Sequence, residues 1–239
     1  ISSTNRTKLA EFDATTIGVR AAGAIKKDKL FYFINYERQD NETPQPFEIN
    51  NYIGNIALQG SSPDIVPGLA ATRIGELSDY LISEYGYNPG EYASTNSSLV
   101  SDKFIAKVDW NINDNHKFAF IYNFLNASKD KPAHPTAIRR RGPDFNTMQF
   151  ANSGYQINNE LNSVLMELNS KFSETVTNKL QVGYTHFNDY RNPFSSPAPV
   201  ISITKDGSPY IIAGHEPFSI NNKLDQKVFQ FTNNLNIIK

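Results

Sequence analysis

The residue types most often used in catalysis or metal binding are sparse in this chain, and their spacing matches no catalytic motif. Its four histidines, His116, His134, His186 and His215, lack metal-ligand spacing, and the sequence contains no cysteine. No serine lies in a nucleophile elbow, and no glycine-rich phosphate loop occurs. We therefore expect no enzyme and no resident cofactor or metal. His116 is expected in a turn, His186 near a membrane interface, and the other two histidines in loops.

Four tyrosines in one long polar segment are the first candidates for ligand binding. They are Tyr52, Tyr80, Tyr87 and Tyr92. Their rings could stack on a sugar or a peptide ligand. The alternative, which we favour, is that these rings pack the segment onto itself, because a long loop needs its own small core.

Three consecutive arginines, Arg139, Arg140 and Arg141, stand in a second polar segment. Guanidinium groups match phosphate in a bidentate geometry, so this cluster could hold lipopolysaccharide phosphates or an anionic substrate. A solvated run of charge is the commoner reading of such a cluster.

The elements that must carry these residues are strands. A unit of two alternating strands around a tight polar turn occurs three times, with turns at 26–29, 113–116 and 173–177. Long loops separate the units. Short turns at one end, long loops at the other and strands of about ten residues are typical of a transmembrane β-barrel of the outer-membrane type. The short turns should face the periplasm.

Alternation divides each strand into an apolar and a polar side. The side chains that we expect to face lipid and form an aromatic girdle are Trp110, Phe118, Phe120, Tyr122 and Phe124. On the opposite side of the same segment stand Lys117, Ala119, Ile121 and Asn123. In the first hairpin, Phe31 and Phe33 fall on the inward side, which implies that something packs inside the barrel.

Composition agrees with a barrel wall. Hydrophobic residues make up 39% and aromatic residues 12% of the 239 residues, as expected where only every second residue meets lipid. No run of about 18 apolar residues exists, so no transmembrane helix is expected. The formal net charge of −1 gives no reason to expect nucleic acid as a partner. The absence of cysteine suits a protein that crosses an oxidising periplasm.

We expect the whole chain, 1–239, to be part of one all-β domain, an antiparallel outer-membrane barrel. The predicted strands cover 16–25, 30–40, 103–112, 117–126, 161–172, 179–190 and 227–238, with extracellular loops at 41–102, 127–160 and 191–226. Seven strands with an unpaired last strand cannot close in lipid, so further strands are expected outside this sequence.

Two loop elements are also predicted. One is a short helix whose apolar residues have helical spacing: Ile74, Leu77, Leu81 and Tyr85, followed by Gly86 and Pro89. The other is a small extra hairpin formed by residues 201–203 and 210–212, with its turn at 206–207.

Two hairpins carry a resemblance to a known family. Residues 18–37, GVRAAGAIKKDKLFYFINYE, and residues 107–117, KVDWNINDNHK, resemble hairpins of TonB-dependent outer-membrane receptors of the Oar type, which are related to the SusC-like transporters. The match is specific at these two hairpins and departs at Ala24, where the family commonly has proline.

The resemblance implies a barrel of about 22 strands with an N-terminal plug, in the outer membrane of a Gram-negative bacterium. Its function would be active uptake of a large nutrient, a glycan, peptide or chelate. Implied partners are outer-membrane lipids and lipopolysaccharide, the rest of the barrel and its plug, TonB through a region before this sequence, and a surface lipoprotein or other outer-membrane protein. Two alternatives stay open: a barrel that serves as an adhesion or assembly scaffold, and a soluble β-sandwich that binds carbohydrate.

Overall fold

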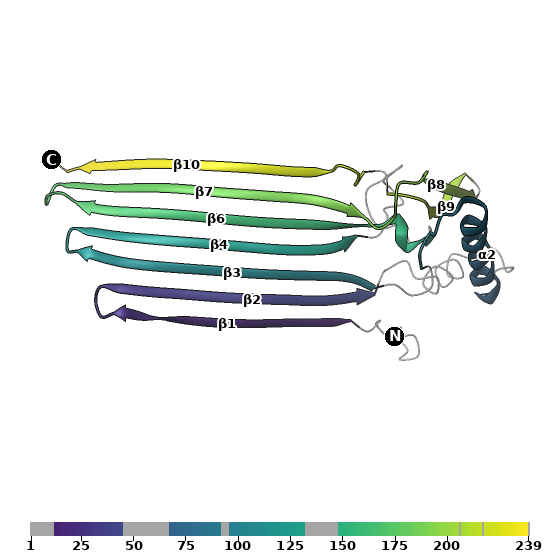
Figure 1. Ribbon diagram of the computed structural model, residues 1–239, viewed down its shortest axis with the longest axis horizontal. Helices are drawn as coiled ribbons and strands as arrows, with labels where there is room; N and C mark the ends of the chain where they lie inside the picture. Colours follow the sequence, from purple (N-terminus) through teal and green to yellow (C-terminus); the bar gives the residue numbers. More distant parts are fainter. Residues whose placement is uncertain are drawn as a thin grey trace, which may run out of the picture.

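A computed structural model describes residues 12–44, 67–91, 96–131, 148–205, 207–216 and 218–238. Its main body is a seven-stranded antiparallel sheet with the strand order β1-β2-β3-β4-β6-β7-β10 (Figure 1). The strands are β1 (Asp13–Lys26), β2 (Leu30–Pro44), β3 (Asn96–Asn113), β4 (His116–Lys131), β6 (Tyr155–Lys171), β7 (Val176–Pro193) and β10 (Lys223–Ile237). Neighbours in the sheet are therefore also neighbours among the long strands in sequence.

Three tight turns join these strands at one end of the sheet (Figure 1). In the first, Asp28 adopts a positive φ of 55°, which aspartate tolerates better than most residues. In the second, the side-chain oxygen of Asn113 accepts hydrogen bonds from the backbone N–H groups of Asn115 and His116, both at 2.9 Å. In the third, the backbones of Ser173 and Val176 are hydrogen-bonded to each other. Local polar residues thus fix each reversal of the chain.

The strands lie where the alternation predicts them, but most extend further at the end away from the tight turns. The largest differences are at β3, which begins at Asn96 instead of 103, and at β6, which begins at Tyr155 instead of 161. The predicted loop boundaries 41–102, 127–160 and 191–226 were therefore too wide. The added residues are mostly polar and lack apolar alternation, so only the backbone ladder reveals them as strand.

A smaller unit lies beyond the outer ends of the long strands (Figure 1). It contains the helix α2 (Pro67–Tyr85), the 3-10 turn η3 (Ala151–Ser153) and a three-stranded sheet with the order β5-β9-β8. Its strands are β5 (Met148–Gln149), β8 (Ile201–Lys205) and β9 (Ser208–Ala213). The predicted helix and hairpin are both present. The parallel pairing of β5 with β9 was not expected from the sequence.

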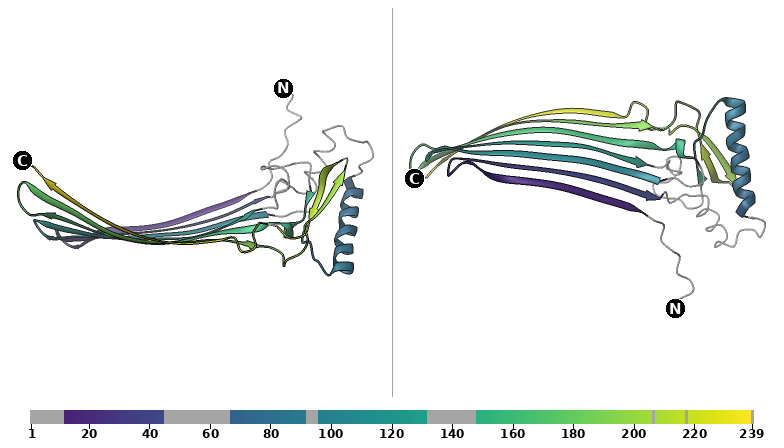
Figure 2. Two further views of the ribbon diagram at one scale, coloured as in Figure 1. Left: turned by 90° about the horizontal axis from the view of Figure 1, so that it is seen from above. Right: turned by 60° about the horizontal axis from the view of Figure 1, so that its bottom comes forward.

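The long sheet is curved, with β1 and β10 at its two edges (Figure 2). Within the described residues, each of these two strands pairs on one side only. The sheet is thus an open arc of barrel wall. The helix α2 ends where the sequence predicts, at Gly86, which takes a positive φ of 61° directly after the last helical residue.

Candidate functional site: a two-faced wall and its loop cap

The strand register aligns apolar side chains into continuous rows on one side of the sheet, here called the apolar face. Leu30 pairs with Trp110 and then Phe118, and Tyr36 pairs with Phe104 and then Phe124. Between these rows lie two more, which contain Tyr32, Val108, Phe120, Met166 and Val182, and Ile34, Ala106, Tyr122, Val164 and Tyr184. All five predicted girdle residues therefore share one face, and Trp110 lies in the row nearest the tight turns.

The opposite side of the sheet, the polar face, carries charges at the same levels as these apolar rows. Lys107 Nζ lies 2.9 Å from Asp109 Oδ1, on the polar face between the rows of Ala106 and Trp110. Nearer the tight turns, the carboxylate of Glu167 contacts Lys179 Nζ at 2.9 Å and accepts a hydrogen bond from Gln181 Nε2 at 2.8 Å. Because charged side chains are costly in hydrocarbon, only the apolar face is compatible with lipid.

Polar residues bound the apolar face at both ends. Near the tight turns, His116 Nδ1 lies 3.0 Å from Ser170 Oγ. At the other end a row called here the outer belt consists of Arg38, Asp102, Asn126, Glu160, Asn188 and Asp225. On β4 the two boundaries, His116 and Asn126, are ten residues apart (126 − 116). That is about 34 Å along a strand, or about 26 Å across a membrane at a tilt of about 40°, which matches the apolar band of outer-membrane barrels.

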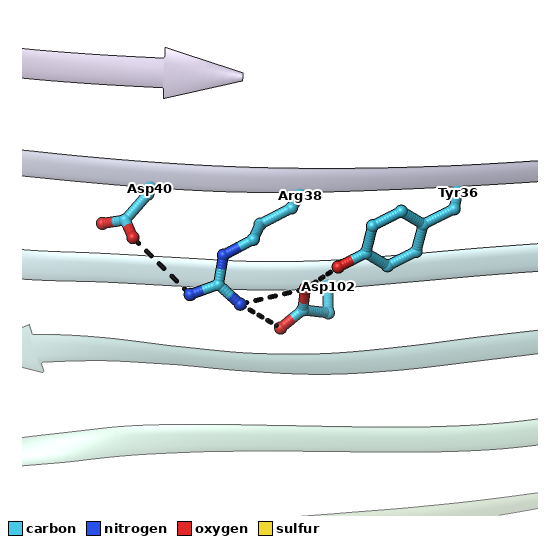
Figure 3. A network of polar contacts seen from close by, with 4 residues as sticks. All are labelled: Tyr36, Arg38, Asp40 and Asp102. Carbon is cyan, nitrogen blue, oxygen red and sulfur yellow. Dashed lines mark hydrogen bonds and ion pairs between the residues drawn. The ribbon is translucent and has the colours of Figure 1, made fainter. Parts of the chain in front are cut away.

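A hydrogen-bonded network straddles the upper boundary of the apolar face (Figure 3). Tyr36, in the last apolar row, donates from Oη to Asp102 Oδ1 at 2.5 Å. Arg38 Nη1 donates to both oxygens of Asp102, at 3.2 and 2.9 Å, and its Nη2 lies 3.6 Å from Asp40. The ion pair of Arg38 with Asp102 is partly exposed to solvent, so its contribution to stability is small. Its geometry suits a tyrosine with its ring in the apolar band and its hydroxyl among polar groups.

The same boundary is also polar on β6, β7 and β10, toward the other edge of the sheet. Glu160 accepts hydrogen bonds from Asn188 Nδ2 at 2.8 Å and from Tyr190 Oη at 3.3 Å. His186 Nε2 lies 2.9 Å from Asp225 Oδ1, at the level where the sequence places this histidine near an interface. The outer belt was not predicted from the sequence. The sequence feature that could have indicated this belt is the end of the alternating apolar series at Tyr36, Phe104 and Phe124, beyond which the strands continue with polar residues.

The smaller unit, called here the loop cap, joins segments from all three long connections. Its buried core consists of Ile74, Leu81, Phe150, Ile211 and Ala213, against which Leu77, Tyr87, Ile201 and Ile203 pack. Backbone hydrogen bonds add to these contacts: Phe150 N donates to Ile212 O at 3.2 Å, and Ala151 N donates to Glu91 O at 2.9 Å. The three connections therefore form one packed body.

The predicted ligand-binding tyrosines occupy different environments. Tyr87 packs against the core of the loop cap, and burial of its hydroxyl, which has no hydrogen bond to the described residues, raises its pKa. Ser195 and the Gly214 backbone face this hydroxyl without reaching hydrogen-bonding geometry. Tyr80 is 52% exposed and meets Tyr85 edge to face, with ring centroids 5.8 Å apart. Tyr87 therefore packs inside the loop cap, while the ring of Tyr80 is open to solvent.

Several predicted positions lie outside the described residues: Tyr52, Tyr92, Arg139, Arg140, Arg141 and His134. Among the residues that the structure describes, no three acidic or histidine side chains gather as a metal site. No helix in that part of the chain combines the length and apolar character needed to span a membrane.

Comparison with known proteins agrees with this geometry. The family model described as "Outer membrane beta barrel domain" matches residues 70–239, well over half of the chain. The chain belongs to this outer-membrane β-barrel family. The chain is also similar to the crystal structure of the outer membrane transporter YddB from Escherichia coli, with a TM-score of 0.57 and 11% identity over 99% of this chain. No curated protein matches the chain in sequence.

The family places this β-barrel chain in the outer membrane. Its mostly antiparallel strand content is the fold that the alternation predicts, and the soluble β-sandwich alternative is wrong. At 11% identity the likeness to YddB shows a shared fold, and the chain spans about a quarter (24%) of that transporter chain.

Proposed function

We propose that this segment is part of the wall of a TonB-dependent transporter that takes up a large nutrient. In this proposal the apolar face, with the girdle residues Trp110, Phe118, Phe120, Tyr122 and Phe124, meets membrane lipid. The polar face lines the interior of a larger barrel, which further strands complete at the free edges of β1 and β10.

The observation that carries the proposal is the charged polar face. The ion pairs of Lys107 with Asp109 and of Lys179 with Glu167 stand at the depth of the apolar rows. Such groups need water or polar protein beside them, as in a wide barrel with a channel or a plug.

An internal plug is supported by two aromatic residues on the polar face. Phe31 pairs with Asp109 and Phe33 with Lys107, close to the tight turns. Both aromatic rings are half-buried in the open arc, and a plug domain would cover them. TonB would engage the plug from the periplasm, and nothing in the described wall is proposed to act as an enzyme.

The loop cap is the proposed outer surface for capture. Tyr80 and Tyr85 present exposed rings on α2, at a place where a glycan, peptide or chelate arriving from outside would meet the transporter. Arg139, Arg140 and Arg141 remain candidates for contact with lipopolysaccharide phosphates. A surface lipoprotein would also approach from this side.

The test is growth of a strain that lacks the gene for the full-length protein. We expect that it loses growth on one class of nutrient, among iron chelates, oligopeptides and oligosaccharides, and that a TonB-deficient strain shows the same loss. A Tyr80→Ala variant should reduce uptake, whereas Glu84→Ala, an exposed change on the same helix, should not. Unchanged growth on every nutrient, together with loss of cell adhesion, would favour the scaffold function instead.

A further inference from the structure

A groove of about 710 Å³ opens on the outer surface of the wall, beside the ends of β7 and β10. Its floor contains Glu160, Asn188, Tyr190 and Asn192. Asn188, Tyr190 and Asn192 alternate along β7, and Glu160 pairs with Asn188, so all four side chains lie on the same side of the sheet as the apolar rows. The groove therefore begins at the outer belt, directly above the apolar band.

The opposite wall of the groove comes from the connection between β7 and β10, at His215 and residues 219–222. Glu216 and Ser219 are 5% and 0% exposed, and the Glu216 carboxylate accepts hydrogen bonds from Ser219 Oγ and from Phe218 N. Asn222 N donates to Ser219 O at 3.2 Å, and Arg191 N donates to Asn222 O at 3.0 Å. These bonds fix the wall against the end of β7, so the groove is a formed feature.

Two residues that line this groove have a buried polar atom without a hydrogen-bond partner among the described residues. His215, which lines it, is 4% exposed, and its Nδ1 lies 3.3 Å from Ser195 Oγ. Its Nε2 makes no hydrogen bond with the described residues, and the same is true of Oδ1 of Asn188, which also lines the groove. Because buried polar atoms are nearly always paired, these two atoms mark the places where a polar occupant would bond.

The lining offers donors and acceptors together. The Glu160 carboxylate accepts hydrogen bonds from Asn188 and Tyr190, and two cationic residues, Arg191 and Lys223, also line the groove. This mixture of donors and acceptors suits hydroxyl groups, which donate and accept at once. The volume is that of a small-molecule site and far exceeds that of a single water.

We infer that the groove binds the core saccharide of lipopolysaccharide in the outer leaflet. Membrane headgroups lie just beyond the apolar band, which is the level of the outer belt where the groove begins. The inference rests on the proposed orientation of the apolar face toward lipid. It does not depend on which nutrient the transporter carries.

The test uses the purified full-length protein in detergent and a lipid-free core oligosaccharide released from rough lipopolysaccharide. Asn192→Trp would fill the groove, and we expect it to weaken oligosaccharide binding at least tenfold and to lower the lipopolysaccharide that copurifies. The matched control is Asn126→Trp, an exposed change in the outer belt on β4 outside the groove, which should bind as the unchanged protein does. His215→Phe keeps a ring but removes Nε2, and should also weaken binding.

Equal binding by the unchanged protein and Asn192→Trp would overturn the inference, as would oligosaccharide binding without copurifying lipopolysaccharide. The result is separable from the proposed transport function. Normal saccharide binding with no nutrient uptake would refute only the proposed transport function. Normal uptake with no saccharide binding would refute only the proposed saccharide site in the groove.

Discussion

The strongest test of the wall is a charge placed in the middle of the apolar face, at Phe120. This residue is four positions from the polar boundary at His116 and six from the boundary at Asn126. After a strand tilt of about 40°, these spacings correspond to about 10 Å and about 16 Å, which places Phe120 within about 3 Å of the midplane. Phe120→Arg should therefore carry nearly the full midplane cost of about 2 to 4 kcal/mol.

The measurement is equilibrium unfolding in urea of the full-length barrel folded into phospholipid vesicles. The expected cost corresponds to a loss of about 30-fold to about 700-fold in the folding equilibrium. Two control variants separate the effect of the sheet face from the effect of depth in the membrane. Asn123→Arg, on the polar face of the same strand, should cost much less, and Asn126→Arg, in the outer belt, should cost about 0 to 1 kcal/mol. An equal or larger cost at Asn123 would refute the assignment of the apolar face to lipid.

Further predictions concern the boundaries and the loop cap. Leu81→Ala removes a buried side chain (3% exposed) and should loosen the cap by about 2 to 5 kcal/mol, seen as faster proteolysis of the cap while the barrel stays heat-resistant. Cysteines at Glu84 and Asn115 should label oppositely in intact cells, with only Glu84→Cys reached by an impermeant reagent; labelling of Asn115→Cys alone would reverse the orientation. Tyr36→Phe removes the exposed hydrogen bond to Asp102 and should change stability by less than about 1 kcal/mol in the same urea assay.

The long strands could be predicted because their signal is local. Side chains alternate with a period of two, so Phe118, Phe120, Tyr122 and Phe124 can be assigned to one face without any knowledge of their neighbours. Pairing then follows from the tight turns, which leave little choice of register. The outer extensions of β3 and β6 were missed because residues such as Ser97 and Asn158 alternate without an apolar side.

The loop cap could be predicted only in pieces. The apolar spacing of Ile74, Leu77 and Leu81 indicates a helix, and the pattern around 201–212 indicates a hairpin. Their joint packing depends on Phe150, which comes from a third connection and is 1% exposed. No local pattern in the sequence marks Phe150 as the side chain that joins the helix to the hairpin.

This packing changes what an experiment on the first long loop can show. A deletion of residues 54–90 would remove α2. Ile74 and Leu81 would be lost with it, and these side chains form the core against which β9 packs. Lost uptake after such a deletion would then report a disordered cap as readily as a lost ligand contact. Single changes at the exposed Tyr80 avoid this, because its side chain is outside the buried core. Function of the cap is therefore best tested on the surface of α2, with its packed face left intact.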